Sequence, residues 1–231
     1  MTKKIDINKI VNKDAIIKQS KANAINFDIH YSEATDDIFK EITGIIVILN
    51  NIRSQVKLNE LENICYSILK TSLKSIYASL ELLRNGYKLQ PGIIIRQAIE
   101  SQCVSLFLKK YPKKLSLYRT DELLKDEVIV AAFGIVPCFG RHYNFFLQLY
   151  RGLIELHQND NEHLSNLKND NTVLLNLHFI RLSVWMLIIA IENVFFEYLP
   201  KKRYWVKCKK GYVYRPNKDE QIWMEKFIGD T

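Results

Sequence analysis

The sequence predicts an all-α protein, a helical bundle of about five to seven helices with a small, β-hairpin-like basic extension at its C-terminus. Hydrophobic residues make up 48% of the 231-residue chain and recur at helical spacing over long segments. Eight glycines and five prolines are too few turn-forming residues for an all-β protein of this length. We therefore expect a bundle domain over residues 1–199 and an extension, residues 200–231, packed on or beside it.

Three helices are expected before the turn at Gly86. The preceding thirty residues, with isoleucines among lysines and asparagines, are expected to hold a short helix packed on the bundle. Ser32 precedes several acidic residues and is typical of an N-cap, so a helix should begin there and run to about Gln55. The clearest helical pattern covers residues 61–83, and Gly86 is expected to end that helix.

The later helices follow from the same periodicity. One is predicted from Pro91 to the lysines before residue 112, antiparallel to its predecessor, and another over residues 121–139, where Gly134 and Pro137 indicate an early end. The helix over residues 121–139 should begin at Asp121. A further helix over residues 142–157 and a polar loop over 158–170 come next. The last helix should begin at Asn171 or Thr172 and end at Pro200.

The extension carries the net charge of the chain. The formal charge is +8, from 33 basic and 25 acidic residues, and eight of the basic residues lie between positions 201 and 218 without any acid. The rest of the chain is therefore balanced, with 25 residues of each sign. The apolar runs 204–206 and 212–214, separated by basic residues and Gly211, predict a hairpin that turns near Lys210 and Gly211. A short helix with Ile222, Trp223 and Phe227 is expected to follow. We expect any preference for polyanions to reside here.

Cysteine usage and the absence of a targeting pattern favour the cytoplasm. Cys65, Cys103, Cys138 and Cys208 are widely spaced and are expected to be buried thiols in a reducing compartment. The first residues show no signal-peptide or transit-peptide pattern. The apolar run over residues 182–191 is shorter than the ~20 residues of a spanning helix, so we expect a core helix and no membrane partner.

Arg96 and Glu100 form the first candidate site. Their i, i+4 spacing places them on one helix face with Ile93, Val104 and Phe107, so a charged pair interrupts an apolar row. Charges at such a position are costly unless they are paired or hydrogen-bonded. Two interpretations remain open, a buried structural ion pair and a polar catalytic site at the centre of the bundle.

Arg151 and His157 form the second candidate site. His157 has the chemistry of an acid–base catalyst, and Arg151 is suited to holding a phosphate group. In a straight helix the two side chains lie about 120° apart around the axis, so they converge only if the helix bends, which Gly152 permits. The alternative is a histidine that caps the C-terminus of the helix.

The extension itself is the third candidate site, because it combines cations with aromatic rings. Basic residues neutralise phosphates and aromatic rings stack on bases, so the segment has the composition of a nucleic-acid-binding surface. The alternative is a hairpin whose aromatic rings pack on the bundle while its lysines point to water. The candidate residues are Lys201, Lys202, Arg203, Tyr204, Trp205, Lys207, Lys209, Lys210, Tyr212, Tyr214 and Arg215.

Motifs for several common chemistries are absent from the sequence. It contains no glycine-rich phosphate loop, zinc-protease motif or nucleophile elbow, and no Cys/His cluster with metal-ligand spacing. We therefore expect neither a cofactor nor a metal.

Three segments together resemble the HEPN-type helical superfamily, and more narrowly a bacterial branch in which a helix with Arg-x-x-x-Glu packs against a later helix ending in histidine. They are residues 82–87, Arg96 to Glu100 and residues 149–157, and the resemblance covers roughly residues 60–199. It implies a helical bundle, frequent homodimerisation and, in active members, a metal-independent ribonuclease with Arg and His at a dimer-interface cleft. Toxin–antitoxin and phage-defence systems are the typical settings.

By this resemblance, His157 acts on the ribose 2′-hydroxyl or the leaving oxygen, Arg151 stabilises charge on the phosphate, and the extension holds RNA. Active members usually have a polar residue directly after the motif arginine, where this chain has Gly152. The alternative function is a non-catalytic, dimeric helical interaction module that binds nucleic acid or a protein partner such as an antitoxin. In that case Arg96 and Glu100 are structural.

Overall fold

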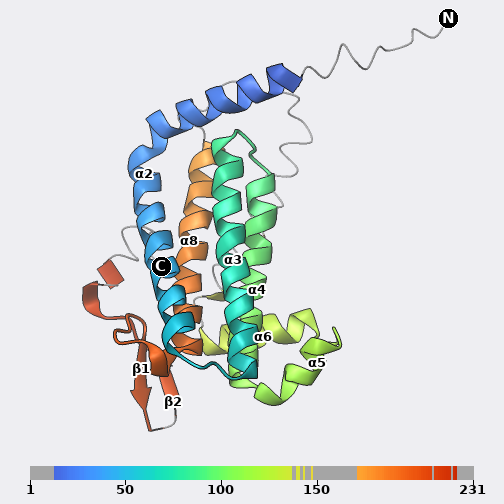
Figure 1. Cartoon of the computed structure of the whole chain (residues 1–231), viewed down its shortest axis with the longest axis vertical. Helices are drawn as coiled ribbons and strands as arrows, with labels where there is room; N and C mark the ends of the chain where they lie inside the picture. The colour runs from blue at the N-terminus through green and yellow to red at the C-terminus, as the bar shows by residue number, and fades with distance from the viewer. Residues whose placement is uncertain are drawn as a thin grey trace, which may run out of the picture.

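The fold is built on long helices that lie side by side (Figure 1). The computed structural model describes residues 13–136, 139–140, 143, 147, 171–209, 211–219 and 221–222. Within them, α3 packs on α4, and α8 packs on both. The long helices are α2 (Lys13–Gln55), α3 (Glu60–Arg84), α4 (Gln90–Lys110) and α8 (Asn171–Val194). The predicted all-α bundle with a small hairpin is thus confirmed.

Helix α3 is fixed at both ends by its own sequence. Asn59 and Glu62 form a reciprocal capping box, in which the Asn59 side chain accepts from the Glu62 amide at 2.9 Å and the Glu62 carboxylate accepts from the Asn59 amide at 3.0 Å. At the other end, Gly86 takes a positive φ of 96°, a conformation that glycine adopts without steric cost. The predicted end of this helix at Gly86 is confirmed.

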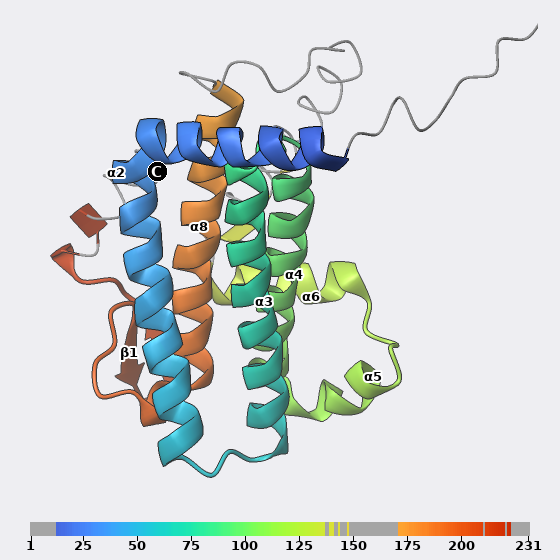
Figure 2. The same cartoon turned by 45° about the horizontal axis from the view of Figure 1, so that its top comes forward.

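Helix α2 begins well before Ser32, so the predicted N-cap there is wrong. Its backbone is non-helical at Tyr31, with φ −125° and ψ 15°, and the helix continues on both sides of this kink. Tyr31 and Phe27 are buried, with ring centroids 5.1 Å apart, so tertiary packing holds the chain helical before residue 32. The part before the kink, residues 13–30, crosses the ends of α8, α3 and α4 (Figure 2). We call it the arm.

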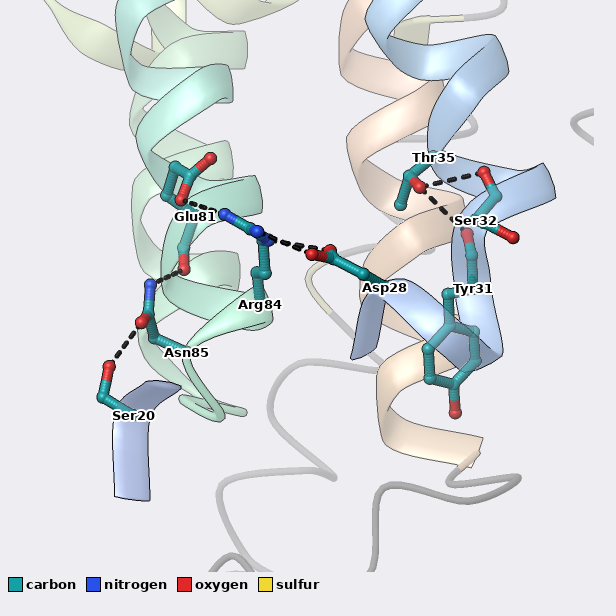
Figure 3. Close-up of polar contacts among 8 residues, drawn as sticks. All are labelled: Ser20, Asp28, Tyr31, Ser32, Thr35, Glu81, Arg84 and Asn85. Carbon is teal, nitrogen blue, oxygen red and sulfur yellow. Dashed lines mark hydrogen bonds and ion pairs between the residues drawn. The ribbon is translucent and has the colours of Figure 1, made fainter. Parts of the chain in front are cut away.

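The arm is fastened to the C-terminal end of α3 by polar contacts (Figure 3). Arg84 donates from Nε and Nη2 to the two carboxylate oxygens of Asp28, at 2.7 and 2.6 Å. Asn23 donates to the backbone oxygen of Asn85 at 3.1 Å, and the Ser20 hydroxyl donates to the Asn85 side chain. These contacts tie the arm to the turn that follows α3.

Between α4 and residue 136, the chain forms three short helical pieces. The helix predicted over residues 121–139 starts later than expected, because Asp121 adopts a left-handed conformation with φ 59° and lies in a turn. Its end at Ile135 agrees with the predicted early end. The helix predicted over 142–157 and the loop over 158–170 lie outside the described residues, apart from Tyr143 and Leu147. The pieces are η1 (Pro112–Lys114), α5 (Leu115–Arg119) and α6 (Lys125–Ile135).

Helix α8 is the central helix of the core. Its described part begins at Asn171, and the residues before it lie outside the described ones, so the predicted start is not tested. The helix ends at Val194, before Pro200, and a 3-10 turn, η2 (Phe196–Tyr198), follows it. Within the described residues, α8 is the one helix long and apolar enough to cross a membrane. However, 78% of its most apolar window is buried inside the bundle, as in a core helix.

The hairpin lies beside the lower ends of α2 and α8 (Figure 1). Strands β1 (Trp205–Cys208) and β2 (Gly211–Tyr214) are antiparallel, with Trp205 opposite Tyr214 and Cys208 opposite Gly211. The position predicted for the hairpin is confirmed. Of the short helix predicted after it, Trp223 and Phe227 lie outside the described residues.

Candidate functional site

Glu100 is the centre of a polar cluster at the contact between α4 and α6. One carboxylate oxygen, Oε1, accepts from Arg96 Nε at 2.9 Å, from the Tyr143 hydroxyl at 2.8 Å and from Lys125 Nζ at 2.7 Å. Arg96 lies one turn earlier on α4, and Lys125 is the first residue of α6. The pairing of Arg96 with Glu100 follows from their spacing, whereas the other two partners come from tertiary packing.

The Arg96–Glu100 pair lies at the edge of the bundle. The side chains are 46% and 23% exposed. Of the neighbours expected to form an apolar row with them, Phe107 is buried but Ile93 is 60% exposed. The predicted position at the bundle centre is therefore wrong, because this face of α4 turns towards α6 and solvent.

The cluster holds Glu100 in its ionised form. Burial raises the pKa of Glu100, but the hydrogen bonds from Lys125, Tyr143 and Arg96 lower it more, so its pKa lies below the ordinary value of a glutamate. Burial and the neighbouring Glu100 carboxylate raise the pKa of Tyr143, which therefore stays protonated at neutral pH. A carboxylate with a lowered pKa is a weak general base near neutrality. The electrostatics favour a structural role for this cluster.

The second predicted pair, Arg151 and His157, lies outside the described residues. Among the described residues, no group of three His, Cys, Asp or Glu side chains is placed to hold a metal ion.

The described cysteines have two different environments. Cys65 and Cys103 are buried, and burial raises the pKa of each thiol to about 12, so both remain protonated and unreactive at neutral pH. Cys208, on β1, is exposed, so its predicted burial is wrong. Cys138 lies outside the described residues.

Three basic side chains of the extension are held within the chain. Lys207 Nζ lies 2.8 Å from Glu197, and Arg203 Nη1 lies 3.3 Å from Glu41. Lys202 Nζ lies 4.6 Å from the centre of the Phe196 ring. These three cations are partly neutralised or shielded by their neighbours.

Four other basic side chains have no partner among the described residues. They are exposed, they lie before the hairpin, in its turn and after it, and three of them were among the predicted nucleic-acid-binding residues. Lys210, also predicted, lies outside the described residues. The four are Lys201, Lys209, Arg215 and Lys218. We call them the free basic set.

The aromatic residues of the extension pack inwards. Tyr204 is fully buried and Trp205 is 4% exposed, and the Trp205 indole donates to the Ile189 backbone oxygen at 2.9 Å. These two rings have no face for a nucleic-acid base. Tyr212 is half-buried, with its ring 4.2 Å from that of Phe196, and its hydroxyl donates to Glu197. The arrangement corresponds to the alternative in which the aromatic rings pack on the bundle.

A buried carboxylate anchors the extension to α8. Glu192 is 4% exposed and accepts from the backbone amides of Arg203 at 2.8 Å and Tyr204 at 2.9 Å. Sequence reasoning did not assign it a role, although an acid at the end of the apolar run of α8 was the available signal. The carboxylate orders the chain that enters the hairpin.

Comparison with known proteins gives no relative: no family model, no curated protein and no solved structure matches this chain.

Proposed function

We propose that this chain is a non-catalytic helical module that binds RNA through the free basic set. The observation that carries the proposal is a group of four exposed cations without an acidic partner among the described residues, on a segment anchored to the core by Glu192 and Trp205. An anchored segment loses little conformational entropy when it binds a polyanion. Because most aromatic rings of the segment pack inwards, binding should depend on phosphate contacts more than on base stacking.

Salt dependence tests this proposal directly. If the four side chains neutralise four phosphates of a single strand, the logarithm of the binding constant should fall with the logarithm of salt concentration with a slope of about −3. The measurement is fluorescence anisotropy of a labelled single-stranded RNA over a range of potassium chloride concentrations. The variant Lys201→Gln/Lys209→Gln/Arg215→Gln/Lys218→Gln should lose most of the affinity and most of the slope.

A variant of equal charge supplies the control. Lys18, Lys21, Lys40 and Lys74 are exposed residues of α2 and α3 without a partner among the described residues. Changing all four to glutamine reduces the net charge by the same amount as the test variant. RNA binding should survive in this control, and equal losses in both variants would refute a localised surface. Binding of anionic lipid vesicles with no binding of RNA would also refute the proposal.

A metal-independent ribonuclease is the second candidate function. One observation supports it: the Arg96 side chain is 46% exposed, so a phosphate at the surface can reach its guanidinium, although Glu100 partly neutralises the charge. The test is cleavage of a mixed RNA pool, with and without EDTA, by the wild type and by His157→Ala. Metal-independent cleavage that disappears in the variant would support a ribonuclease with His157 in its active site. If neither protein cleaves RNA, the ribonuclease function is rejected and the non-catalytic RNA-binding module is favoured.

The resemblance also predicts a homodimer. Sedimentation equilibrium of the wild type checks this prediction, and a single species of about 27 kDa would contradict it.

A further inference from the structure

The hairpin holds two members of the free basic set at a fixed separation. Lys209 lies in its turn, and Arg215 directly follows β2, where its amide donates to the Tyr204 backbone oxygen at 2.7 Å. A strand rises about 3.4 Å per residue, so the Cα atoms of Lys209 and Arg215 lie roughly 15 Å apart. Glu192 and Trp205 anchor the base of the hairpin to α8. The backbone spacing of these two cations is therefore set before any ligand binds.

The outward face of the hairpin carries valines where a single-strand-binding surface has aromatic rings. Val206 and Val213 lie opposite each other, are 49% and 50% exposed, and alternate along the strands with Trp205 and Tyr214. Trp205 is buried, and the ring centroids of Trp205 and Tyr214 are 5.9 Å apart. Valine side chains neither stack on a base nor take part in hydrogen bonds. Among its described residues, the outward face thus presents cations and small apolar groups.

A single strand gains little from such a surface. Proteins that bind single strands combine cations with aromatic rings, and each base stacked on a ring strengthens binding roughly five- to 150-fold. A single strand also has to be ordered along the hairpin, which opposes binding. A double helix already holds its phosphates in place, on two strands that border each groove, and needs no stacking on the protein. Fixed cations without exposed rings between them therefore suit a duplex better.

We infer that the RNA bound by the free basic set is double-stranded and is bound without regard to its sequence. This inference rests on the proposed RNA binding and names the form of the RNA. Lys209 at the turn and Arg215 at the base of the hairpin contact phosphates on the two strands of the duplex. The base edges of an RNA duplex lie in a deep, narrow major groove that side chains do not read, so these cations contact the backbone in any sequence.

A matched set of RNAs tests the form of the ligand. A labelled single strand of about 20 nucleotides without self-complementarity, and the same strand annealed to its complement, are titrated with the full chain by fluorescence anisotropy. The duplex should bind at least about fivefold more tightly, and a second duplex of different base composition should bind equally well. Equal or tighter binding of the single strand would overturn this inference alone, and so would a clear preference between the two duplexes. If the wild type binds neither form, the proposed RNA binding fails and this inference fails with it.

Aromatic rings placed on the outward face give the decisive variant. Val206→Tyr/Val213→Tyr adds two rings that can stack on bases and leaves every basic side chain in place. It should raise the affinity for the single strand at least about fivefold and so remove most of the preference for the duplex. Val206→Ile/Val213→Ile is the matched control, because it enlarges the same side chains without adding a ring and should keep the wild-type preference. Both changes suit a β-strand, and far-UV circular dichroism checks that the fold is retained. An unchanged preference for the duplex in Val206→Tyr/Val213→Tyr would overturn the inference.

Discussion

At the scale of single residues, Glu100 shows how a charge is held at the edge of a helical bundle. Its Oε1 atom accepts three hydrogen bonds, and two of the donors carry a positive charge. Charge-assisted hydrogen bonds of this kind stabilise a fold more than neutral ones, but only while the acceptor is ionised. The contribution of Glu100 to stability should therefore depend on pH.

We expect Glu100→Gln to lower the free energy of unfolding by about 2 kcal/mol at neutral pH. The folded-state pKa of Glu100 is lowered, so its contribution is present above the ordinary pKa of 4.5 and is lost as the pH falls through the folded-state pKa. The difference between wild type and variant should therefore shrink below about pH 4.5. Urea denaturation at pH 7 and at pH 3 measures both differences.

Glu122→Gln is the control for this prediction. Glu122 is exposed and has no side-chain partner among the described residues, so its replacement should change stability little at either pH. A constant difference between wild type and Glu100→Gln from pH 7 to pH 3 would contradict the lowered pKa of Glu100.

Only one of the three contacts of Glu100 was predictable from the sequence. The i, i+4 spacing predicted the Arg96–Glu100 pair because it depends on helix geometry alone. Lys125 and Tyr143 reach Glu100 from other parts of the chain, and no local pattern encodes that approach. The sequence left two roles open for Trp205, stacking on a nucleic-acid base and packing on the bundle, because its burial against α8 depends on where the hairpin docks.

At the scale of secondary-structure elements, the arm of α2 is held by the buried Phe27 and Asn23 and by an ion pair at the surface. The Arg84 and Asp28 side chains are 35% and 49% exposed, and an ion pair this accessible contributes less than about 1 kcal/mol. Beyond the kink at Tyr31, the rest of α2 places more side chains in the core, namely Ile38, Ile42, Ile45, Leu49 and Ile52. The arm should therefore open more readily than the bundle.

We expect Arg84→Ala to accelerate amide hydrogen exchange over residues 17–30 by roughly two- to fivefold while leaving the exchange of α8 unchanged. The measurement is hydrogen exchange followed by mass spectrometry of peptides from the arm and from α8. Arg119→Ala is the control, since it removes another surface ion pair, with Glu60, away from the arm. Equal acceleration of arm exchange in both variants would contradict the role of Arg84.

Helices with strong local signals at their ends were predictable, and helices shaped by packing were not. Gly86 predicts the end of α3 and Pro91 predicts the start of α4, and the structure has both helix ends there. Ser32 resembled an N-cap, yet the burial of Phe27 and Tyr31 extends the helix past it. Asp121 resembled a helix start because acids favour that position, but its positive φ places it in a turn.

At the scale of the whole molecule, the bundle and the start of the extension share one core. Tyr204 and Trp205 are buried with the apolar residues of α8, and the Tyr204 ring lies 6.4 Å from that of Trp185. A chain with one continuous core unfolds in a single cooperative step. Unfolding of the wild type in urea should therefore give superimposable curves by tryptophan fluorescence, which includes Trp205, and by far-UV circular dichroism, which reports on the helices.

Glu192→Ala should separate those two curves. The substitution removes the acceptor of two backbone amides, one of which belongs to the buried Tyr204, and an unsatisfied buried amide costs about 1–3 kcal/mol. That cost falls on the junction between bundle and hairpin, so the hairpin should detach first. The part of the fluorescence change that comes from Trp205 should then occur at lower urea concentration than the loss of helix, whereas the part from Trp185 in α8 should accompany it. Glu197→Ala removes an exposed acid that contacts the same hairpin through Lys207 and Tyr212, and its two curves should still coincide. If the curves of Glu192→Ala also coincide, apolar packing of Tyr204 and Trp205 is sufficient to hold the extension, and the buried carboxylate is not required to position the free basic set.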